Sequence, residues 1–305
     1  MFPNPQNYHV MKTLLAAILL LASFSLMAQP QSEAKLNCSY EELTAPDFVR
    51  AVEKSSGVCL LPFGILEKHG PHLPLGTDIF ECRKVALTAA EQEYCVVFPL
   101  YYTGQINEAR HQPGTIAYSS ELIWKVLQET CDELSRNGMK KIIIVNGHGG
   151  NNDFLKFFCM SQLHSPKDYV LLFFQPSESP ETSKKIAALR QTNTGGHADE
   201  METSMMRFIR PDLVRTERAG SQSGKKQERL AEIPFQYTGI WWYADYPNHY
   251  AGDATKSSPE LGKLIVESEA SQLVQLIKIM KQSSKIQDLQ NRFYRESGDP
   301  LHTAQ

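Results

Sequence analysis

The sequence predicts a three-layer α/β/α fold built on a mainly parallel sheet. Four short apolar runs rich in β-branched and aromatic residues have the continuous hydrophobicity of strands buried on both faces. Amphipathic stretches with helical spacing lie between these runs. Because strands and helices alternate along the chain, the strands are expected to be parallel, with helices on both faces of the sheet. The predicted strands are 57–63, 94–100, 141–145 and 169–174.

Helix start and stop signals bound the stretches between the strands. Asn137-Gly138 is a helix-stop signal, and Ser258 followed by proline is a typical helix start. Residues 219–259 are rich in Gly, Ser and aromatic residues and predict long loop excursions, with a candidate hairpin around 237–243. The predicted helices are 79–93, 119–137, 152–164 and 259–281.

The N-terminus predicts an exported protein. An apolar run from Thr13 to Leu26 follows Met11-Lys12, and it is shorter than the roughly 20 residues of a membrane anchor. We therefore expect a signal peptide, translated from Met11 and cut after Ala28, and a periplasmic or secreted protein with no stable membrane span after cleavage. The predicted segments are the signal peptide 1–28, a linker 29–40, a single domain 41–285 and a C-terminal tail 286–305.

Composition narrows the class of partner. The chain is 42% hydrophobic and 21% charged with a net charge of -3, which is ordinary for a globular protein and provides no basic surface for nucleic acid. A small-molecule partner is therefore expected. The six cysteines are scattered without a CxxC pair, and three lie within apolar runs, which favours buried free thiols over disulfides or a thiolate zinc site.

Three polar motifs follow predicted strands. GILEKHGPHLPLGTD (64–78) follows the first strand, and NGHGGNN (146–152) follows the third. TGGHADEMETS (194–204) comes roughly twenty residues after the fourth strand. Ligands of parallel sheets gather at the carboxyl ends of the strands, so the three motifs are expected to converge on one pocket.

The first two motifs have the chemistry of a metal site. Glu67 and His69 are two residues apart, so in an extended segment their side chains point the same way. Asp78 follows a Pro- and Gly-rich loop that allows it to fold back to the same point, and the glycines around His148 leave space for a ligand. Mixed carboxylate and imidazole ligands suit zinc, manganese or iron.

The third motif leaves two roles open. On a helix, His197 and Glu200 lie about one turn apart, whereas Glu202 projects roughly 140° from His197. One glutamate is expected to bind metal and the other to act as acid or base, and the spacing alone does not assign them. We expect His72 to support the loop rather than bind metal, and His249 fits a pocket wall and the surface equally well. Each motif alone has an ordinary structural explanation, but three at matching strand ends favour one site.

Together these motifs resemble the creatininase (creatinine amidohydrolase) family. The resemblance implies a creatininase-like fold with two divalent metal ions per chain, Zn, Mn or Fe. It implies hydrolysis of a small, often cyclic amide at a non-peptide carbon-nitrogen bond by a metal-bridged hydroxide, and assembly into a homo-oligomer, often a hexamer. The resemblance covers roughly residues 40–280. Its motifs are Glu-x-His-Gly-x-His-Leu-Pro-x-x-x-Asp (67–78), His-x-Pro-Gly-Thr (111–115), Asn-Gly-His-Gly-Gly-Asn (146–151) and His-Ala-x-Glu-x-Glu-Thr-Ser (197–204).

The resemblance also implies roles for individual residues. Asp78 corresponds to a bridging ligand, His197 to the histidine beside the substrate, and either Glu200 or His197 to the proton donor. The chain departs from creatininases at Gly150, where they have an acidic residue, and it has no clear counterparts of their substrate-enclosing tryptophans. The alternatives are hydrolysis of a formamide or a short peptide, and a non-catalytic metal- or ligand-binding protein on the same fold. The implied metal ligands are Glu67, His69, Asp78, His148 and Glu202.

Overall fold

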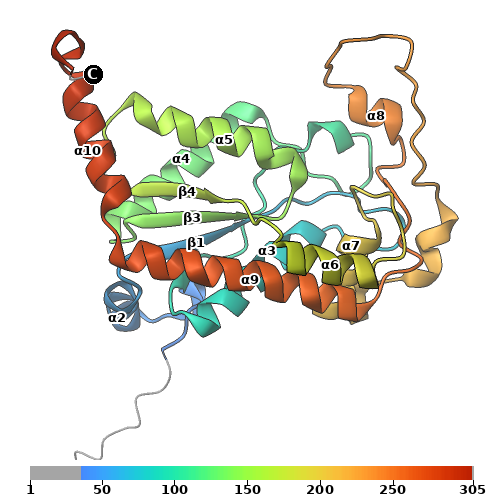
Figure 1. Ribbon diagram of the computed structural model, residues 1–305, viewed down its shortest axis with the longest axis horizontal. Coiled ribbons are helices and arrows are strands. Elements are labelled where there is room, and N and C mark those ends of the chain that lie inside the picture. Colours follow the sequence, from blue (N-terminus) through green and yellow to red (C-terminus); the bar gives the residue numbers. More distant parts are fainter. Residues whose placement is uncertain (1–35, 304–305) are drawn as a thin grey trace, which may run out of the picture. The chain divides into compact units, whose positions relative to one another are not determined.

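A four-stranded parallel sheet lies at the centre of residues 36–303, the part of the chain that this computed structural model describes (Figure 1). The strand order is β2-β1-β3-β4, and every neighbouring pair is parallel, which confirms the predicted sheet. All six residues of β1 are buried, as the continuous apolar run requires. The strands are β1 (Val58–Phe63), β2 (Val96–Val97), β3 (Lys141–Asn146) and β4 (Val170–Phe174).

Helices cover both faces of this sheet and complete the predicted three layers. On one face lie α4 (Ser120–Arg136) and α5 (Asn152–Ser161), and on the other lie α3 (Thr77–Gln92) and α9 (Pro259–Gln282) (Figure 1). Alternate strand residues such as Val58 and Leu60 share one apolar core with α3 and α9. Burial of these side chains is worth roughly 25 cal/mol per Å² and holds the layers together.

Side-chain caps set where the helices begin. Ser119 accepts a hydrogen bond from Leu122 N at the start of α4, and Ser258 accepts one from Leu261 N at the start of α9. Asp199 caps α7 (Glu200–Ile209), which packs against α9, by accepting from the second and third helical amides. This cap fixes Glu200 and Glu202 in the first turn of α7.

Two loop predictions need correction. No strand occurs between residues 219 and 259, and the aromatic run that suggested a hairpin instead forms the short helix α8 (Trp241–Asp245). Its amides bond locally, Trp241 N to Thr238 O and Ala244 N to Ile240 O, so they are not available to a partner strand. The segment assigned to a tail contains α10 (Lys285–Ser297). The remaining α-helices are α2 (Ala45–Ser55) and α6 (Pro180–Leu189).

The predicted signal peptide 1–28 and most of the predicted linker lie outside the described residues. Between residues 36 and 303, no helix combines the length and apolar character needed to cross a membrane. The cysteines that the sequence placed in apolar runs include Cys59 and Cys95, which are buried free thiols, as are Cys82 and Cys131.

Candidate metal centre

The polar motifs after β1 and β3 meet because the two strands end side by side. Phe63 and Asn146, the last residues of these strands, are paired in register. The chain after β1 runs as irregular loop until α3 begins, and Asp78 lies in the first turn of that helix. A Cβ at Gly147 would lie 2.2 Å from the Asp78 carbonyl oxygen, so only glycine allows α3 to approach the end of β3 this closely.

Asp78 lies between two imidazoles. Its Oδ1 is 2.9 Å from His69 Nε2, and its Oδ2 is 3.4 Å from His148 Nδ1. Glu67 Oε1 is 2.8 Å from His148 Nδ1 and 3.8 Å from His69 Nε2. All four side chains are buried. A carboxylate whose two oxygens face different imidazoles has the arrangement of a ligand that bridges two cations.

The chemistry of this cluster fits divalent metal ions. Glu67 Oε1 and Asp78 Oδ2 are both buried and both face one nitrogen, His148 Nδ1, which can donate its proton to only one of them at a time. Buried carboxylate oxygens that are incompletely hydrogen-bonded are costly, and a bound cation offsets that cost. Two sets of three residues could each hold a cation, because within each set the possible ligand atoms lie within 4.8 Å of one another. One set is Glu67, His69 and His197, and the other is Glu67, Asp78 and His148.

Nearby carboxylates hold the two histidines of the cluster in the charged form when no cation is bound. Burial lowers the pKa of His69, but Asp78, Glu67 and Glu202 outweigh it and raise the pKa to about 10. Burial likewise opposes the charge on His148, yet Glu67 and Asp78 raise its pKa well above the usual value. Cation binding must therefore displace protons from these rings, which makes metal affinity depend on pH.

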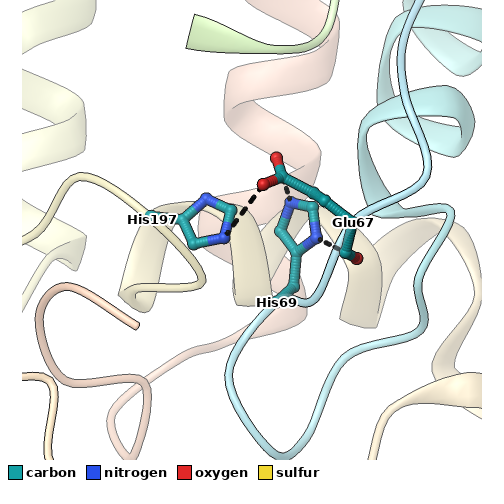
Figure 2. Close-up of side chains that lie close together, drawn as sticks. All are labelled: Glu67, His69 and His197. Carbon is teal, nitrogen blue, oxygen red and sulfur yellow. Dashed lines mark hydrogen bonds and ion pairs between the residues drawn. The ribbon is translucent and has the colours of Figure 1, made fainter. Parts of the chain in front are cut away.

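His197 lies beside Glu67 and His69 and has a different character (Figure 2). Its ring centroid is 4.3 Å from that of His69. The Nε2 is 2.9 Å from the Lys68 carbonyl oxygen and is assigned the proton that it donates there. Burial lowers the pKa of His197 to about 3, so the ring is neutral and its Nδ1 has a free lone pair. That Nδ1 lies 3.9 Å from Glu202 Oε2.

The two glutamates of α7 point in different directions. Glu202 Oε2 is 4.0 Å from His69 Nε2, and burial raises the pKa of Glu202 to about 8. The Glu200 carboxylate accepts hydrogen bonds from Gln191 N at 2.8 Å, Thr192 N at 2.7 Å and Thr192 Oγ1 at 2.6 Å. Within residues 36–303 its hydrogen bonds all go to this loop, so the structure does not place Glu200 where an acid or base for the cluster would stand.

His249, for which the sequence favoured no position, is part of the site. It is buried, its Nε2 donates to Glu67 Oε2, and its Nδ1 accepts from Trp242 Nε1 at 2.8 Å. The Trp242 and His197 rings meet edge to face with centroids 5.9 Å apart, which provides an aromatic wall that sequence reasoning missed. No spacing signal marks the contact of His249 with Glu67, because these residues are 182 apart in the chain.

Two side chains of the loop after β1 tie the cluster to its surroundings. His72 is buried and its Nε2 lies 2.8 Å from Thr203 Oγ1 on α7. Burial lowers its pKa to about 4, so the ring is neutral and joins loop to helix. Lys68 points away from the cluster, and its Nζ donates to Gln222 Oε1 at 2.8 Å and to Asn248 O at 2.6 Å.

A buried set of carboxylates and imidazoles at the carboxyl edge of a parallel sheet defines a metal-binding α/β protein. The creatininase family model, described as creatinine amidohydrolase, matches residues 41–277. The chain therefore belongs to the creatininase family, and the resemblance drawn from the motifs is confirmed.

Curated relatives are hydrolases with different substrates in their names. Creatinine amidohydrolase of Pseudomonas putida is 26% identical over 197 residues, which cover 58% of this chain and 74% of that protein. Mycofactocin precursor peptide peptidase of Mycolicibacterium smegmatis is 31% identical over 164 residues, 52% of this chain and 60% of that protein. 3-Dehydro-scyllo-inosose hydrolase of Thermotoga maritima is 25% identical over 257 residues, 75% of this chain and 79% of that protein.

Solved creatininase structures share the fold. A crystal structure of creatinine amidohydrolase is 22% identical with a TM-score of 0.69 and matches over 82% of this chain and all of that chain. A manganese form of creatininase matches with a TM-score of 0.68 at 22% identity, over 81% of this chain and all of that chain. The predicted fold class is thereby confirmed.

Proposed function

We propose that this protein is a metal-dependent hydrolase of a small amide. The observation that supports this most strongly is the placement of Asp78, whose two oxygens face the imidazoles of two separate histidines. A manganese form and a Zn-Zn form occur among the similar creatininase structures, which favours these two ions here. The proposed ligands are Glu67, His69, Asp78, His148 and Glu202.

The side chains of the cluster are arranged to bind cations and to exclude water. When bound, two divalent cations lower the pKa of a water toward neutrality and polarise a carbonyl group. Glu67 and Asp78 supply the negative charge that holds cations in a buried site. His249 engages one oxygen of Glu67, which leaves the other oxygen directed at His148. Burial of the ligands excludes bulk water, so the charges act in a medium of low dielectric constant.

We assign proton transfer to His197. Its Nε2 donates to a backbone carbonyl, which leaves Nδ1 as the acceptor that faces the cluster. A neutral imidazole in this position relays a proton from the attacking water to the leaving nitrogen, and because its pKa is low the ring passes the proton on rather than retaining it. Glu200 is bonded to the loop at residues 191 and 192, so we assign it no step.

The choice of substrate depends on the side chains that surround the cluster rather than on the metal ions. Trp242 and His249 bound the cluster on the side of the 219–259 excursion. A cyclic or linear small amide is our first assignment. Hydrolysis of a short peptide is the second, and it is favoured by the relative named as a peptide peptidase. Gly150 has no side chain to offer where creatininases have an acidic residue, which disfavours creatinine itself.

Metal content and turnover, measured on one preparation, test this proposal. We expect protein purified without chelator to contain about two divalent ions per chain. We also expect it to hydrolyse a member of a panel of creatinine, N-formyl compounds and short peptides. Absence of metal would contradict the whole proposal. Bound metal with no turnover of any compound would favour the non-catalytic alternative.

We also propose that the protein is exported and forms a homo-oligomer. Export is supported by the apolar run after Met11-Lys12. Assembly is supported by exposed apolar side chains on the excursion, such as Phe235 and Tyr237, and on α5, such as Phe157 and Met160. N-terminal sequencing of protein from the periplasm or medium tests the cleavage after Ala28. Analytical ultracentrifugation tests the assembly, and a monomer at micromolar concentration would contradict it.

A further inference from the structure

The outer nitrogen of a proposed metal ligand lacks a hydrogen-bond partner. His148 directs Nδ1 at Glu67 and Asp78, so Nδ1 is the nitrogen that faces a cation. In a neutral ring with Nδ1 deprotonated, the proton is on Nε2. That Nε2 is buried and makes no hydrogen bond within the described residues. An unsatisfied buried N–H destabilises the fold, so an acceptor is expected nearby.

Glu108 directs a carboxylate oxygen toward that nitrogen. It lies on the 3₁₀ helix Asn107–Ala109, in a segment distinct from the motifs that hold the cluster. Its Oε1 is 4.0 Å from His148 Nε2, and its side chain is only 19% exposed. Its Oε2 accepts a hydrogen bond from Gln105 Nε2 at 2.9 Å, which holds the carboxylate with the other oxygen toward His148.

Gly150 keeps the space between these two groups open. A Cβ at residue 150 would lie 2.4 Å from His148 Nε2 and 2.7 Å from Glu108 Oε1. Any side chain at this position would therefore enter the gap that the imidazole and the carboxylate share. Glu108 can therefore approach His148 only because residue 150 has no side chain.

We propose that Glu108 is a positioning residue for His148. The 4.0 Å between His148 Nε2 and Glu108 Oε1 is too long for a direct hydrogen bond but fits one bridging water, for which Gly150 leaves the space. Through that water Glu108 accepts the Nε2 proton and holds Nδ1 in the orientation that binds a cation. Carboxylates that orient a ligating histidine in this way typically strengthen metal affinity about 10- to 100-fold. The inference rests on the proposed metal centre and adds a specific expectation. Glu108 should influence the ion beside His148, Glu67 and Asp78, but not the ion beside His69 and Glu202.

Release of zinc from the loaded protein tests this inference without any assay of activity. Protein loaded with Zn²⁺ is mixed with a chromophoric chelator, and the two release phases are followed. We expect Glu108→Ala to speed the release of one ion per chain about 10- to 100-fold and to leave the other unchanged. Glu108→Gln keeps an acceptor oxygen and should fall between Glu108→Ala and the natural chain. Glu121→Gln, at a glutamate whose side chain is 77% exposed, should change neither phase.

A second variant separates positioning from a general loss of structure. Gly150→Ala should speed the same release phase, and combining it with Glu108→Ala should add little, because both changes remove one interaction. Fully additive effects, or unchanged release in Glu108→Ala, would overturn the inference. A change in KM with unchanged zinc release would also overturn it, since Glu108 would then act on the substrate. If the natural chain binds no zinc, the proposed function itself fails.

Discussion

Two sides of the same site hold histidines in opposite electrostatic settings. On the carboxylate side, His69 and His148 face Asp78 and Glu67, which raise the pKa values of both rings despite burial. On the aromatic side, burial lowers the pKa values of His197 and His249 to about 3. The rings of His69 and His197 are nonetheless only 4.3 Å apart. All four rings are buried, so the balance of neighbouring charges separates them: the carboxylates outweigh burial at His69 and His148, whereas the charge on His69 adds to burial in lowering the pKa values of His197 and His249.

The two sides also come from different parts of the fold. The carboxylate side consists of the loops that leave β1 and β3 and the first turn of α3. The aromatic side comes from loops, where Ala198 and His249 adopt positive φ values of 54° and 49°. Segments anchored directly to the ends of β1 and β3 therefore hold the proposed metals, while the long 219–259 excursion presents Trp242 and His249 toward the substrate. Long loops vary more readily than segments anchored to strand ends, which fits relatives named for different substrates.

Asp78→Asn is the change that should affect the carboxylate side most. It removes the charge shared by the two proposed ions with little change of shape, so both ions should be lost. Activity should fall on the order of 10³-fold or more. Elemental analysis and initial rates measure both effects. Retention of two ions per chain would show that Asp78 is not shared.

His197→Gln should separate the two sides of the site. If His197 belongs to the aromatic side and transfers protons, activity should fall about 10²- to 10⁴-fold while metal content stays near that of the natural chain. His302→Gln, at an exposed histidine, is the matched control and should leave both unchanged. Loss of metal in His197→Gln would instead assign the ring to the carboxylate side as a ligand.

Glu200→Ala should affect folding rather than chemistry. The variant leaves the amides of Gln191 and Thr192 without their carboxylate, which should lower the free energy of unfolding by about 2–4 kcal/mol. Urea denaturation measures this loss, and metal content should be nearly intact. Glu202→Ala is the counterpart on the same helix turn and should lose metal. Equal metal loss in both variants would contradict the different assignments of the two glutamates.

Glu269→Gln tests a half-buried carboxyl that has no imidazole among the groups that shift its pKa. Burial, with a contribution from Glu178, raises the pKa of Glu269 on α9 to about 7. The unfolded value is near 4.5, so folding is disfavoured progressively from pH 4.5 upward and fully above pH 7. The variant should be more stable than the natural chain by about 1–2 kcal/mol above pH 7 and equal to it below pH 4.5. Urea denaturation at pH 4.5 and pH 8 measures the difference, and an equal gain at both values would contradict this assignment.

The sequence predicted the sheet and the carboxylate side because both depend on local patterns. Continuous apolar runs mark strands buried on two faces, and parallel topology then brings Glu67 and His148 to one edge. The aromatic side was not predictable in the same way. The contact of His249 with Glu67 and the approach of Glu108 to His148 depend on the tertiary path of loops, which no spacing records. The Asp199 cap sets the rotation of α7, which directs Glu202 toward His69 and Glu200 toward the loop at residues 191 and 192, and the spacing of the motif does not record that rotation.

The three residues from Glu67 to His69 form an extended strip whose two sides make different contacts. Glu67 and His69 face inward, while Lys68 fastens the strip to Gln222 and Asn248 on the excursion. Because side chains alternate, a shift of one residue within the strip would turn the lysine into the cluster and both ligands out of it. Insertions and deletions should therefore be tolerated in the neighbouring loops but should abolish metal binding when they fall between Glu67 and His69. The spacing of this tripeptide fixes which side chains face the cluster.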